Sequence, residues 1–83
     1  MTQHTSATAR RIGTCTEPAD ILIEGRSTID GGLAYGRIRI EVYACQAHAR
    51  EARTQWIPRP LTAFDAIAEP THGHRCGEAY DRG

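Results

Sequence analysis

Residues 36–44 read GRIRIEVYA, and the chain continues directly into CQAH at 45–48. Along the first stretch, apolar side chains alternate strictly with charged or polar ones, with Ile38, Ile40, Val42 and Ala44 set against Arg37, Arg39, Glu41 and Tyr43. A period of two residues is typical of a strand with one buried and one solvated face. The stretch therefore predicts a half-buried strand of an antiparallel sheet.

A partner for this strand is predicted upstream, over residues 19–24, where Ala19, Ile21 and Ile23 share one face. Between the two strands, residues 30–32 read DGG, which is a turn signal. The pair would form an antiparallel hairpin with a long loop over about residues 25–34.

Downstream of the hairpin, the sequence predicts a helix from Gln46 to Trp56, because strong helix formers dominate it. Its inward face comprises Cys45, His48, Ala49, Ala52 and Trp56. Pro58 ends it, since the residue before a proline is pushed out of the helical region. Residues 61–68 predict a further short helix, with inward side chains at Leu61, Phe64 and Ile67. The expected fold class is small α+β, with a hairpin followed by one packed helix.

The length of 83 residues allows one domain. Residues 1–11 are polar and lack a period, so we expect a disordered tail there and a single domain over 12–83. A chain this short buries a small core, and comparable scaffolds add a disulfide, a metal or a partner. Three cysteines cannot all pair within one chain.

The charges of the chain balance. Ten arginines balance ten acidic residues, so no net charge draws the chain to nucleic acid or to an anionic membrane. No apolar run resembles a signal peptide or a bilayer span, and we expect a cytoplasmic protein with reduced thiols. Lys and Asn are absent, which indicates a GC-rich genome.

The sequence places a thiol and an imidazole where the predicted strand meets the predicted helix. Cys45 and His48 are three residues apart on a first helical turn, so both side chains can reach one metal ion. Cys15 lies in a turn that the hairpin would bring near Cys45. Cys76 is followed by Gly77, which permits a tight turn, and it is the first candidate for the fourth ligand. His74 and His72 are the alternates. A Cys3His set is typical of structural zinc.

This order of elements resembles the treble-clef group of zinc fingers over about residues 12–56, and the chain is similar to small zinc-binding proteins of actinobacteria. The resemblance implies a knuckle, a hairpin and a helix whose first turn supplies two ligands. The chain departs from the pattern in the knuckle, where Ile12 stands at the position of a second cysteine.

Other interpretations of the same residues stay open. The cysteines could be small buried hydrophobes, and His48 a core histidine. Cys45 and His48 could also form a nucleophilic pair, although no oxyanion hole is evident. If His48 binds a metal, its second ring nitrogen would need an acceptor, and Glu51 lies within reach along the helix.

The outward row of the 36–44 strand, extended by one residue, carries Tyr35, Arg37, Arg39 and Tyr43. Aromatic and arginine side chains are common binding anchors, although the C-terminal segment could instead cover this row through Phe64 or Tyr80. The expected function is a zinc-stabilised module that binds a protein partner. A nucleic-acid-binding regulator of phage or mobile-element type is the alternative, and a thiol-redox protein or metal-dependent enzyme comes last.

Overall fold

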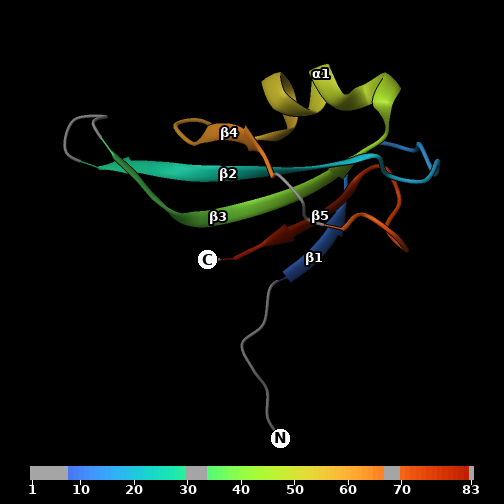
Figure 1. Ribbon diagram of the computed structural model, residues 1–83, viewed down its shortest axis with the longest axis horizontal. Coiled ribbons are helices and arrows are strands. Elements are labelled where there is room, and N and C mark those ends of the chain that lie inside the picture. Colours follow the sequence, from blue (N-terminus) through green and yellow to red (C-terminus); the bar gives the residue numbers. More distant parts are fainter. Residues whose placement is uncertain (1–7, 30–33, 67–69, 83) are drawn as a thin grey trace, which may run out of the picture.

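A computed structural model of the chain describes residues 8–29, 34–66 and 70–82. Its five strands form one antiparallel sheet in the order β1-β5-β3-β2-β4, which Figure 1 shows from bottom to top. The strands are β1 (Thr8–Arg11), β2 (Ile21–Ile29), β3 (Ala34–Ala44), β4 (Thr62–Asp65) and β5 (Glu78–Asp81). One short helical segment lies above β2, so the small α+β class is confirmed. Within the described part, no helix is long and apolar enough to cross a membrane.

The hairpin of β2 and β3 forms the centre of the sheet, as the alternating pattern predicts. Its register runs from Ile21 opposite Ala44 to Ile29 opposite Ala34, with shifts on either side of Arg26. The predicted loop over about residues 25–34 is wrong for 25–29 and for Ala34, because β2 and β3 stay paired past Gly25 despite these irregularities. The predicted turn at 30–32 lies outside the described residues.

The predicted helix has the predicted limits but three different hydrogen-bonding patterns. A 3-10 turn, η2 (Gln46–His48), leads into α1 (Ala49–Glu51) and then into a π-helical turn, η3 (Ala52–Trp56). Ile57 is extended, as expected before Pro58. Ala49 and Ala52 are buried, so the predicted inward face is the packed one.

The predicted helix over residues 61–68 is wrong. Residues Thr62–Asp65 form β4, which pairs with Arg26–Ile23 of β2. The free edge of β2 supplies backbone partners that a four-residue segment cannot supply for itself. An ion pair from Arg53 to Asp65, at 2.8 Å, also fastens β4 to the helical segment. Ile67 lies outside the described residues.

The boundary of the predicted tail also needs correction. Thr8–Arg11 form β1, which pairs with β5, so the ordered chain begins before residue 12. The ladder and the ion pair between Arg10 and Asp81, at 2.9 Å, involve residues about seventy positions apart, which local sequence cannot reveal. Residues 1–7 of the predicted tail lie outside the described residues.

Side chains are buried on both faces of the sheet near the end where β3 meets the helical segment. On the helical side, Ile23, Ile40 and Val42 pack with Ala52, Ile57 and two of the cysteines. On the opposite side, Leu22 and Tyr43 pack with Ala19. The fully buried large side chains among the described residues are only Ile23, Ile40, Val42 and Cys76, so the apolar core is small, as the chain length predicts.

Candidate metal centre

Four potential metal ligands from separate parts of the chain meet at this end of the sheet. Cys15 lies in the connection from β1 to β2, and Cys45 directly follows β3. His48 closes the 3-10 turn η2, and Cys76 lies just before β5. Their Sγ and ring nitrogen atoms all lie within 4.8 Å of one another. The structure thus brings together the four residues that the sequence predicts as a set.

The spacing of these atoms suits a tetrahedral ion. Nδ1 of His48 lies 3.2 Å from Sγ of Cys45 and 3.6 Å from Sγ of Cys76. The sulfurs of Cys15 and Cys45 are 4.0 Å apart. Zinc bonds of about 2.3 Å to sulfur and 2.0 Å to nitrogen, at tetrahedral angles, place ligand atoms about 3.5–3.8 Å apart. All three thiols are free rather than joined in disulfides.

Hydrogen bonds and a tight turn fix the backbone around Cys45 and Cys76. Asp20 accepts a hydrogen bond from the backbone N–H of Gln46, at 2.7 Å, and so satisfies a free donor at the start of the helical segment. Cys76 donates its backbone N–H to the carbonyl of Glu17 at 2.8 Å. Gly77 has a φ of 95°, as the predicted tight turn requires, and a Cβ there would clash with the carbonyl oxygen of Ile12.

Arg11 joins two of the ligand-bearing segments. Its guanidinium donates to the backbone carbonyl of Cys15 and, at 3.1 Å, to that of Cys76. Arg11 falls within the stretch predicted to be a disordered tail, so this role was not predicted. The available signal was an arginine four residues before a candidate ligand, which alone does not reveal a contact with Cys76.

The environment shifts the two buried thiols in opposite directions. Burial raises the pKa of Cys45, but contacts with His48, Cys76 and nearby backbone N–H groups outweigh burial and lower it to about 7. Burial, together with the interactions of Cys45 and Cys15, raises the pKa of Cys76 to about 12. A second thiolate beside the first is therefore disfavoured unless a cation compensates the charge.

The alternate ligands His74 and His72 are not part of this cluster. Nδ1 of His74 lies 2.8 Å from Oε1 of Glu78, and its ring stacks on Tyr43 with centroids 3.8 Å apart. Both histidines line a separate pocket beside Pro18. Of the candidates for the fourth ligand, only Cys76 lies with Cys15, Cys45 and His48.

Glu51 lies beside the cluster but has a different partner from the predicted one. Its carboxylate accepts a hydrogen bond from Nε1 of Trp56 at 3.2 Å, and within the described chain it has none with His48. The Trp56 ring is stacked near His48, with centroids 6.1 Å apart. Glu51 therefore orients Trp56, which covers His48, rather than orienting His48 directly.

The outward row of β3 is divided by the fold. Tyr35, Arg37 and Arg39 are exposed, as expected. Tyr43 is buried, because His74, in the segment before β5, and Tyr80, in β5, pack against its ring. Phe64 contacts Tyr35 edge-on at 4.6 Å but leaves it 54% exposed. The exposed part of the predicted binding surface is therefore Tyr35, Arg37 and Arg39, without Tyr43.

Comparison with known proteins assigns no relative to this arrangement. The chain matches no protein-family model, no curated protein and no solved structure. The site is therefore defined by its own geometry: three thiols and one imidazole converge from three segments at the buried end of the sheet.

Proposed function

We propose that the chain is a small zinc-stabilised domain whose role is to bind a protein partner. The observation that carries the metal part is the convergence of Cys15, Cys45, His48 and Cys76 within 4.8 Å. Three soft sulfur donors and one imidazole favour zinc over calcium or magnesium, which prefer oxygen. Iron–sulfur clusters usually require four cysteines.

The proposed zinc is structural rather than catalytic. Four protein ligands fill a tetrahedral shell and leave no position for a substrate. Two of the ligands, Cys45 and Cys76, are buried in the small apolar core. A metal at this position would fasten β3, the helical segment and both connections that carry Cys15 and Cys76. A closed site of this kind makes a thiol-redox protein or a metal-dependent enzyme the least favoured of the three functions.

The likeness to treble-clef zinc fingers is part of the proposal. In favour of it, a hairpin leads directly into a helical turn that carries Cys45 and His48. Against a full match, the first knuckle provides only Cys15, and the fourth ligand comes from the turn before β5. The proposed site is therefore treble-clef-like, with its fourth ligand, Cys76, supplied by the C-terminal segment.

Binding of a protein is favoured over binding of nucleic acid. The net charge is zero, and acidic side chains on the same sheet already pair with arginines, Glu41 with Arg82 and Asp81 with Arg10. Arginine beside tyrosine is a common anchor at protein interfaces. The alternative, a nucleic-acid-binding regulator, draws on the same side chains, because Arg37 and Arg39 could contact phosphates beside the ring of Tyr35.

A double variant, Arg37→Glu with Arg39→Glu, tests the surface. We expect it to fold as the parent does and to lose the partner recovered by affinity capture with cross-linking. Arg50→Glu is the matched control, since Arg50 is exposed on the helical segment away from this row. Recovery of the same partner by the double variant contradicts the proposed surface. Binding of oligonucleotides that weakens steeply with salt would favour the alternative.

A further inference from the structure

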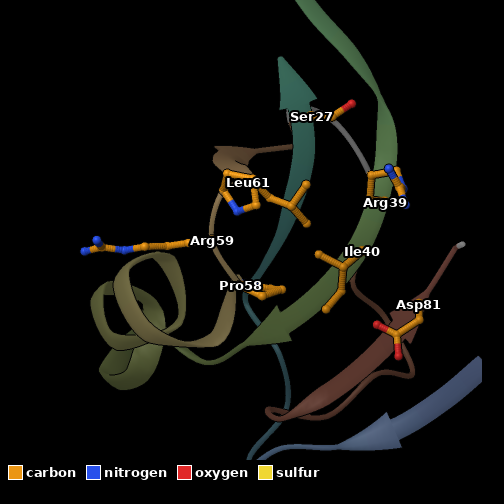
Figure 2. Close-up of a pocket in the computed structure, with 8 residues that line it drawn as sticks. Ser27, Arg39, Ile40, Pro58, Arg59, Leu61 and Asp81 are labelled. Carbon is orange, nitrogen blue, oxygen red and sulfur yellow. The ribbon is translucent and has the colours of Figure 1, made fainter. Parts of the chain in front are cut away.

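A pocket of about 410 Å³ lies beside the β2–β3 hairpin, and the candidate metal centre does not use it. Figure 2 shows it between the segment 58–61 on one side and the strands β3 and β5 on the other. Its apolar lining comes from Ile40, Leu61 and the prolines Pro58 and Pro60. Ser27, Arg39, Arg59 and Asp81 supply the polar groups.

The charges around this pocket are unequally compensated. Asp81 is engaged in an ion pair with Arg10, with a distance of 2.9 Å between Nε and Oδ2. The Arg39 side chain has no hydrogen-bond or ion-pair partner among the residues that the structure describes, and it is exposed. In Figure 2 the Arg59 side chain extends away from Leu61 and the rest of the lining. The pocket therefore pairs an apolar wall with one uncompensated cation, Arg39.

A pocket with an apolar lining and an exposed arginine suits a ligand that has an apolar group next to a carboxylate. Arginine binds a carboxylate through two parallel hydrogen bonds. An apolar side chain placed against Leu61 and the prolines removes apolar surface from water, at about 25 cal/mol per Å². The two contributions add only if both groups belong to one ligand.

We propose that this pocket binds an acidic peptide segment of a partner protein, with an apolar side chain against Leu61 and a neighbouring carboxylate on Arg39. The proposal deepens the proposed function, on which it rests, by naming the chemistry of the partner. Charge complementarity to Arg39 favours an acidic segment over a basic one. The apolar wall of prolines and leucine favours a peptide over a nucleic acid, which would seek more cations and a stacking platform.

Nuclear magnetic resonance titration of the whole 15N-labelled chain tests the pocket with three capped peptides. The probe is acetyl-Asp-Leu-Asp-amide, and its controls are acetyl-Lys-Leu-Lys-amide and acetyl-Asp-Ser-Asp-amide. We expect saturable shifts at Arg39, Ile40 and Leu61 with the probe, at a dissociation constant of about 1 mM. Each control should bind about tenfold more weakly, because it lacks either the carboxylates or the apolar side chain.

Two variants make the result specific. Arg39→Gln should weaken the probe about tenfold, whereas Arg50→Gln, which removes another exposed arginine, should leave its affinity unchanged. Absence of shifts at about 10 mM probe, shifts outside the pocket, or equal affinity in both variants would overturn the proposal. Stronger shifts of the same residues with an oligothymidine would also overturn it, in favour of nucleic acid.

The outcomes for the pocket and for the metal are separate. If the chain is folded and carries zinc but does not bind the acidic peptide, only the proposed peptide site is contradicted. If the chain binds the peptide at this pocket but carries no zinc, only the proposed zinc site is contradicted.

Discussion

At the residue scale, the candidate metal centre depends on side chains that are not ligands. Arg11 holds the backbone carbonyls of Cys15 and Cys76, which belong to segments about sixty residues apart in the sequence. Its positive charge also lies next to a site that would be negative with three thiolates, one imidazole and a divalent ion. Both effects favour the bound metal, through position and through charge.

Arg11→Gln should therefore lower the affinity for zinc by about tenfold or more, within the range of losses seen for residues that support metal ligands. Competition with a chromophoric chelator measures this affinity. Arg10→Gln is the control, because the neighbouring Arg10 forms an exposed ion pair with Asp81 instead. Arg11→Lys should recover part of the affinity by restoring the charge. Equal zinc affinity in Arg11→Gln and Arg10→Gln would show that Arg11 is not a positioning residue.

Residues also explain what the sequence could predict of the site. Cys45 and His48 follow from their spacing, because three residues on a first helical turn fix a common direction. The sequence ranks Cys76 above His74 because Gly77 permits a tight turn, but spacing alone does not exclude His74, whose contact with Glu78 depends on the fold. The burial of Tyr43 depends on the same C-terminal segment.

At the element scale, the central hairpin and the helical segment are predictable because each has a long local pattern. The 11 residues of β3 carry the period of two, and residues 46–56 carry helix formers. By contrast, β1, β4 and β5 have four residues each. Segments this short are ordered by the strand beside them, so their own sequence does not reveal them.

Gly25 shows how the helical segment is set on the sheet. A Cβ at this position would lie 2.6 Å from Cγ2 of Ile40 and 2.9 Å from Cγ2 of Ile57, so only glycine lets the end of the helical segment approach β2. Gly25→Ala should lower the free energy of unfolding by about 1–3 kcal/mol through overpacking. Urea unfolding followed by Trp56 fluorescence measures this change.

Gly36→Ala is the comparison for Gly25→Ala. A Cβ at position 36 would lie 2.5 Å from Oγ of Ser27, and a rotation of the Ser27 side chain can relieve this clash. We therefore expect a smaller loss of stability than for Gly25→Ala. A Gly25→Ala protein as stable as the parent would contradict the close packing described here.

At the scale of the whole molecule, a small core and the candidate metal centre belong together. Only three large aliphatic side chains are fully buried among the described residues, and the cluster of thiols lies at the end of that core. A structural zinc in a small domain contributes folding free energy on the order of 10 kcal/mol. That amount exceeds what an apolar core of this size supplies alone.

The metal content of the purified chain tests this account most directly. Native mass spectrometry of the folded protein should show one zinc ion per chain, and none in Cys45→Ser, since three ligands hold the ion less well than four. We expect the parent chain to carry its zinc through purification without added metal. A parent chain that is folded, monodisperse and free of metal would contradict it, and would leave Cys45 and Cys76 as buried thiols of an ordinary core with Cys15 half-buried beside them.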